Sequence, residues 1–227
     1  MEMYKRKTLY DIDPKTQIDE FGVDHSNFST RDELEYNFKI AEQQQNQANY
    51  SSYGNDFSKD FIDKMQNDAR FKEAMNKYII PNEGGYINDP IDLGGETNLG
   101  ISKKTYGNEN IKNMTRERAN ALLYRDNWDW NGISSLPDEV VGPVFDFGVN
   151  SRALNAIQTV HKTLGINPVG TIIGKQTLQK INGMDKNEFL QQFKNNALSY
   201  YEDLVARRPE NAKFLLGWKN RLNRNIP

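Results

Sequence analysis

The sequence contains no cysteine and only two histidines, His25 and His161. Without cysteine, the chain has no disulfide, no thiolate zinc site and no cysteine nucleophile. The histidines fall on opposite sides of a predicted boundary near residue 66, which disfavours a histidine-built zinc site or a serine–histidine triad. Aspartate and glutamate therefore remain as the candidate catalytic side chains, and we expect no cofactor and no metal.

Long apolar runs and a strong excess of one charge are also missing. No apolar run is long enough to cross a membrane, and residues 1–6 are not followed by an apolar segment, so we expect synthesis in the cytoplasm without a signal peptide and no membrane insertion. The formal net charge is −2. This balance lacks the basic stripe of a nucleic-acid-binding protein, so no nucleic-acid partner is expected.

Residues 1–66 differ in character from the rest of the chain. They hold 8 Lys and Arg against 13 Asp and Glu, whereas the remainder holds 21 against 18. They also contain a Gln- and Asn-rich tract at 43–47 and only a poor helical pattern. We predict a polar, acidic N-terminal extension that is partly disordered, and a modest positive balance elsewhere that suits an anionic polymer.

Beyond residue 57, apolar residues recur at helical spacing. The first clear stripe consists of Phe71, Ala74, Met75, Tyr78 and Ile79. Pro81 lacks a backbone N–H, so this helix should kink or stop just before Glu83. Later stripes predict helices near 115–123, 137–145, 154–164, 178–181, 185–204 and 214–222. No segment alternates with period two, so the fold class is mainly α with at most a small β-hairpin.

Residues 83–101 concentrate unusual chemistry in a short loop. The loop holds four carboxylates, several glycines and the turn-forming Pro90, and it lies between periodic segments. Such a loop is costly to order, which favours an active-site role. Cleavage of a glycosidic bond needs a protonated carboxylic acid and, in most enzymes, a second carboxylate. Glu83 at a helix end beside apolar neighbours is placed to hold a proton, and Asp92 or Glu96 can supply the ionised partner.

Two simpler interpretations apply to parts of this region. Asp89 and Asp92 can build turns before Pro90 and Gly94, and we prefer that interpretation for Asp89. In the aromatic tract after the loop, Tyr124, Trp128 and Trp130 can either pack in the core or form a platform against sugar faces. Core packing is the better alternative for Trp128.

The loop also resembles a known family. Glu83-Gly-Gly-Tyr86, Asn88-Asp89-Pro90, Asp92, Gly94-Gly95-Glu96-Thr97 and Gly100-Ile101 are similar to the signature of glycoside hydrolase family 108, lysozyme-like N-acetylmuramidases of phages and bacteria. The resemblance continues through 125–128, and 146–151 and 217–221 resemble the start and end of the peptidoglycan-binding module that usually follows. It implies a lysozyme-like catalytic region at 67–143 and a helical peptidoglycan-binding-like module at 144–227.

The resemblance also implies roles for individual residues. Glu83 takes the place of the proton donor. By analogy with phage-type lysozymes, Asp92 and Thr97 help to place the attacking water, with Glu96 as the competing second carboxylate. The residues expected to bind substrate are Tyr86, Asn88, Glu96, Tyr124, Trp128 and Asn150.

The expected function is hydrolysis of the β-1,4 bond between N-acetylmuramic acid and N-acetylglucosamine in bacterial peptidoglycan. The alternatives are a lytic transglycosylase and a virion or wall-binding component with a vestigial lysozyme fold. We expect a monomer that acts on the cell wall or in the periplasm. Residues 1–66 are a candidate for docking to a phage particle or secretion apparatus, which would make the protein virion-associated in the first case.

Overall fold

The computed structural model describes residues 53–54, 56–82, 85–88, 95–167 and 169–226. The chain divides after Asn55 into two units, and the second unit, Asp56–Pro227, contains nearly all of the described residues. The extension predicted at residues 1–66 therefore lies largely outside the described residues. Within the part that is described, residues 59–66 belong to the first helix of the second unit.

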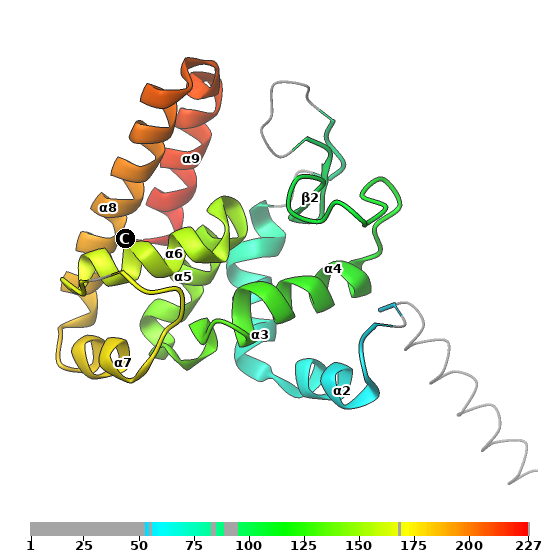
Figure 1. Cartoon of the computed structure of the whole chain (residues 1–227), viewed down its shortest axis with the longest axis horizontal. Helices are drawn as coiled ribbons and strands as arrows, with labels where there is room; N and C mark the ends of the chain where they lie inside the picture. The colour runs from blue at the N-terminus through cyan, green and yellow to red at the C-terminus, as the bar shows by residue number, and fades with distance from the viewer. Residues whose placement is uncertain (1–52, 55, 83–84, 89–94, 168, 227) are drawn as a thin grey trace, which may run out of the picture. The chain divides into compact units, whose positions relative to one another are not determined.

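The second unit is mainly helical, as the sequence predicts (Figure 1). Its α-helices are α2 (Lys59–Asn67), α3 (Ala69–Ala74), α4 (Arg116–Leu123), α5 (Asp138–Ser151), α6 (Ala153–Thr163), α7 (Lys175–Asn182), α8 (Lys186–Arg207) and α9 (Ala212–Asn225). Shorter π or 3₁₀ turns are η1 (Met75–Ile79), η2 (Ile80–Asn82), η3 (Tyr124–Asp129), η4 (Ile133–Ser135) and η5 (Pro209–Asn211). Among the described residues, the one sheet is a hairpin of β1 (Thr97–Asn98) and β2 (Ile101–Ser102).

Side-chain caps fix where several helices begin. The Asp68 carboxylate accepts from the backbone N–H of Phe71 at 2.9 Å at the start of α3. Thr115 caps α4, and Asp185 caps α8 by accepting from two backbone N–H groups. Each side chain satisfies N–H groups that have no partner within the helix. The helix starts expected near Thr115 and Asp185 are confirmed.

Helix α5 is the centre of the unit, with its middle residues buried on every face. It packs against α3, η1 and η3, and also against α6, α8 and α9 (Figure 1). The aromatic core on the first side consists of Phe71, Tyr124, Trp128 and Phe145, whose rings meet edge to face at 4.9–5.8 Å. Helices α8 and α9 form an antiparallel pair on the other side. Through α5 the structure joins the expected catalytic region to the expected C-terminal module.

The helix that leads toward Glu83 changes its winding before it ends. Helix α3 passes into the π turn η1 and then the 3₁₀ turn η2, which contains Pro81 and ends at Asn82. Tyr78 of η1 packs closely on α5, since a Cβ at Gly142 would lie 2.1 Å from its ring. Only glycine permits this approach. The change of winding around Pro81 agrees with the expected interruption of the helix before Glu83, and the contact with Gly142 fixes the position of η1 on α5.

Candidate active site

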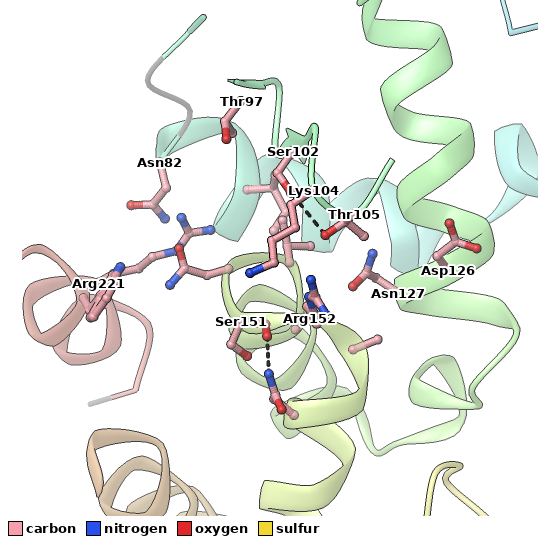
Figure 2. Close-up of a pocket in the computed structure, with 18 of the residues that line it drawn as sticks. Asn82, Thr97, Ser102, Lys104, Thr105, Asp126, Asn127, Ser151, Arg152 and Arg221 are labelled. Carbon is pink, nitrogen blue, oxygen red and sulfur yellow. Dashed lines mark hydrogen bonds between the residues drawn. The ribbon is translucent and has the colours of Figure 1, made fainter. Parts of the chain in front are cut away.

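A groove of about 920 Å³ crosses the second unit. It is lined by the end of η2, the hairpin, η3, the corner between α5 and α6, and residues of α8 and α9. Figure 2 shows side chains from these elements directed into one space, with Thr97 and Lys104 from the hairpin side and Ser151 and Arg152 from the helix corner. The groove is therefore built from both the catalytic region and the C-terminal module.

The hairpin is held in place by its turn. Leu99 and Gly100 form a two-residue turn in which both have positive φ, 51° and 79°. This turn geometry matches the twist of the two strands, and glycine adopts it without strain. A Cβ at Gly100 would lie 3.3 Å from Val149 of α5, so the turn sits tightly against that helix.

Thr97 lies on the groove, as expected of a residue that takes part in the reaction. Its backbone N–H and carbonyl each hydrogen-bond Ile87 at 2.8 Å, which adds a bridge beside β1. Among the described residues, its hydroxyl donates one long contact, 3.4 Å, to the Gly95 carbonyl. The backbone position of Thr97 is thus fixed, while its hydroxyl keeps the capacity to bind a water or a substrate oxygen.

The two principal carboxylates of the sequence analysis, Glu83 and Asp92, lie outside the described residues. The residues next to the first of them are described. Asn82 precedes residues 83–84 and Gly85 follows them, and both line the groove. Gly85 has a φ of 73°, a conformation that favours glycine.

Glu96, Tyr86 and Asn88 form a separate group on the loop. The Tyr86 hydroxyl donates to Glu96 Oε1 at 2.7 Å, and the Glu96 carboxylate raises the pKa of Tyr86. Tyr86 and Asn88 are exposed and Glu96 is half-buried, and none of the three lines the groove as described. The Glu96 carboxylate therefore has a partner away from the groove.

Tyr124 and Trp128 are core residues rather than a sugar platform. Their exposed fractions are 1% and 0%. The Trp128 indole N–H donates to Asp68 at 2.9 Å, and the Tyr124 hydroxyl donates to the same carboxylate oxygen at 3.3 Å. The preference for core packing at Trp128 is confirmed. The placement of both residues among those that bind substrate is corrected, because other aromatic side chains cover their rings. Trp130 is the exposed aromatic of the tract, at 78%.

Asn150 lies on the groove and connects its two halves. Its side-chain amide donates to the Tyr201 hydroxyl at 2.6 Å, and both residues line the groove. Burial raises the pKa of Tyr201, so this phenol stays neutral. The bond joins the end of α5 to α8, close to where the groove passes from one module to the other.

The far wall of the groove was not predicted from the sequence. It consists of Tyr200, Leu204, Phe214 and Trp218, together with Tyr201. Trp218 stacks on Tyr201 with centroids 4.8 Å apart and planes 18° apart. The sequence signal was present, because Phe214 and Trp218 are spaced i, i+4 on the last helix. Such spacing predicts one face of a helix, but it does not reveal that this face borders a groove.

Four cations line the groove, and two of them are engaged in ion pairs. Arg125 binds Asp126 through two contacts of 2.6 and 2.8 Å. Arg221 binds the buried carboxylate of Asp146. The side chains of the other two, Lys104 and Arg152, make no hydrogen bond or ion pair with any residue that the structure describes.

Within the described ranges, no cluster of three or more histidine, aspartate and glutamate side chains has the arrangement of a metal site. Nor does any helix in those ranges combine the length and the apolar character that a membrane span requires.

Two family models match successive segments of the chain. Residues 76–151 match the family model of glycosyl hydrolase 108, and residues 153–223 match the predicted peptidoglycan domain. The solved structure of SagA from Brucella abortus is similar, with a TM-score of 0.61 and 24% sequence identity over 69% of this chain and 91% of that chain. No curated protein matches the chain. The likeness to SagA shows a shared fold, and the two family models meet at the corner between α5 and α6.

Proposed function

We propose that the chain, in which residues 76–151 match glycosyl hydrolase 108 and residues 153–223 match the predicted peptidoglycan domain, is a glycoside hydrolase directed at peptidoglycan and, more specifically, an N-acetylmuramidase. In this proposal it hydrolyses the β-1,4 bond between N-acetylmuramic acid and N-acetylglucosamine. Glu83 is the general acid that protonates the leaving oxygen.

The observation that carries the proposal is the course of the groove. Its lining includes Asn82 and Gly85, the described neighbours of Glu83 in the sequence, as well as Thr97. The segment that contains Glu83 is thus flanked in the sequence by two residues that line the groove. The family match over residues 76–151 includes this same segment.

For the second carboxylate we propose Asp92, with Thr97 as its hydroxyl partner. The competing residue, Glu96, accepts a hydrogen bond from Tyr86 and does not line the described groove. Thr97 lies on the groove, and its hydroxyl makes one long contact with the residues that the structure describes. These contacts support a role for Asp92 and Thr97 in placing the attacking water.

The extent of the same groove supports the proposal that the substrate is a polymer. It is lined by residues of both family matches, so the predicted peptidoglycan domain contributes a wall next to the catalytic segment. Asn150 is the predicted substrate-binding residue that this geometry favours, because it lies where the two walls meet.

The test is wall digestion by matched variants. Glu83→Gln keeps the size of the side chain but cannot donate a proton, and a general acid contributes about 10²–10⁴-fold to rate. We expect Glu83→Gln to release new reducing ends from purified walls at least about 100-fold more slowly than wild type. Glu210→Gln, an exposed glutamate in η5, is the control and should match wild type. Equal release by wild type and Glu83→Gln would contradict the proposal.

A docking role for the N-terminal residues remains a proposal, with a phage particle or a secretion apparatus as the partner. Asp56 pairs with Arg118 of α4, and α2 begins at Lys59, so a deletion that preserves the fold should stop at residue 55. We expect deletion of residues 1–55 to leave wall digestion in solution within about twofold of the full chain. A large loss of digestion by the truncated protein would argue against a docking role.

A further inference from the structure

Arg152 has a backbone conformation that few residues other than glycine adopt. It joins α5 to α6 with φ 88° and ψ 143°. For a residue with a Cβ this conformation is strained, and such strain persists where the surrounding structure or the function requires it. Glycine would relieve the strain at this corner, yet the chain places a long cationic side chain there.

The side chain of Arg152 is available to a ligand. Arg152 is exposed and lines the groove, and its side chain makes no hydrogen bond or ion pair with the residues that the structure describes. Ala153 and Leu154, the first residues of the 11-residue helix α6, also line the groove. The positive end of that helix dipole therefore adds to the charge of the guanidinium.

A second cation reaches the same space from the opposite wall. Lys104 follows β2, is exposed, and likewise has no partner among the described residues. Figure 2 shows its side chain extending from the hairpin side toward the corner that carries Arg152. The remaining cations of the lining, Arg125 and Arg221, already hold carboxylates of the protein.

From this arrangement we infer that Lys104 and Arg152 form a carboxylate-binding subsite for the peptide stem of the substrate. The inference rests on the proposed function. In a wall whose lactyl groups carry peptides, the glycan backbone is neutral and the free carboxylates belong to the stem. A guanidinium binds a carboxylate with two parallel hydrogen bonds, and the lysine adds a point charge. The subsite would make the enzyme prefer glycan that carries peptides.

The experiment compares variants on three substrates: intact walls, walls whose carboxyl groups have been chemically amidated, and glycan strands stripped of peptides by an amidase. On intact walls we expect Arg152→Gln to lower kcat/KM about tenfold, the scale of one charge-assisted contact. Lys104→Gln should lower it about fivefold, and Arg152→Lys should restore part of the loss. Lys162→Gln, which removes an exposed charge from α6 outside the groove, should match wild type.

The two other substrates decide what the cations recognise. On amidated walls the difference between wild type and Arg152→Gln should fall below about twofold. A tenfold loss that persists there would overturn the inference, because the arginine would then have only a structural role. On stripped strands, where the lactyl carboxylate is free, an equally large loss would overturn the assignment to the peptide stem.

Binding without turnover separates this inference from the proposed function. The probe is a soluble muropeptide with a free stem carboxylate, titrated by calorimetry into wild type and Arg152→Gln. Weaker binding by the variant supports the subsite even if wild type releases no reducing ends, in which case the proposed function alone fails. Equal binding by both proteins overturns the inference whatever the activity.

Discussion

Replacing Arg221 with methionine should strongly destabilise the second unit, because it leaves a buried carboxylate without its partner. Asp146 on α5 is only 2% exposed. Arg221 on α9 contacts it through three pairs of atoms at 2.6–3.0 Å, and Asn225 adds a bond at 2.6 Å. Breaking a buried ion pair in this way costs about 3–5 kcal/mol, and a domain of this size loses about 2–4 °C in Tm per kcal/mol. We therefore expect a fall of roughly 10 °C.

The loss of stability caused by Arg221→Met should depend on pH, because the buried Asp146 carboxyl can take up a proton. Burial raises the pKa of Asp146, and the Arg221 guanidinium acts against this rise. Without Arg221, the folded-state pKa rises further above the unfolded value of about 3.9. A raised folded pKa contributes stability below the unfolded pKa that is lost as the pH rises through the folded pKa. The destabilisation should thus be smaller near pH 4 than at pH 7.

The assay is thermal and urea unfolding of the full chain at both pH values. Lys219→Gln is a matched control on the same helix, because it breaks the exposed pair of Lys219 and Glu202, which should contribute less than about 1 kcal/mol. If Arg221→Met costs no more than this control at pH 7, the ion pair does not anchor α9 to α5. Other contacts would then have to hold the two walls of the groove together.

Three further changes test other parts of the structure. Arg152→Gly should raise the free energy of unfolding by about 1 kcal/mol, because it relieves backbone strain at φ 88°, while digestion of intact walls falls; a variant less stable than wild type would contradict this. Burial lowers the pKa of His161, so the free energy of unfolding in urea should decrease as the pH falls below about 6.5, where the unfolded chain takes up the proton. In His161→Gln this pH dependence should disappear. Trp128→Phe should lower the free energy of unfolding in urea by about 2 kcal/mol and leave KM unchanged. A raised KM would indicate that Trp128 contacts substrate.

The sequence predicts the helices well because their signals are local. The stripe that begins at Phe71 lies on the buried side of α3 and η1, and caps at Thr115 and Asp185 follow from short-range hydrogen bonds. His161, which falls within the helical stripe predicted at 154–164, is buried and hydrogen-bonded to Thr177. Patterns of three or four residues determine these features, so no distant contact is needed to predict them.

The groove depends on contacts that sequence spacing does not contain. Asn150 is expected to bind substrate, but the sequence does not predict its bond to Tyr201, because the two residues lie 51 positions apart. The aromatic wall on α8 and α9 resembles an ordinary core stripe in the sequence, because periodicity reports a shared face and not what covers it. Nothing in the sequence singles out Arg152, since a positive φ at an arginine is visible only in the folded backbone.

The most direct test of the proposed muramidase is the chemistry of the new chain ends that wild type produces from purified peptidoglycan. Mass spectrometry before and after borohydride reduction identifies the sugar at each new end. The proposal predicts N-acetylmuramic acid ends that carry the added water and become reduced, and it predicts their loss in Glu83→Gln. Anhydro ends, which would indicate a lytic transglycosylase, N-acetylglucosamine ends, or no new ends would contradict it.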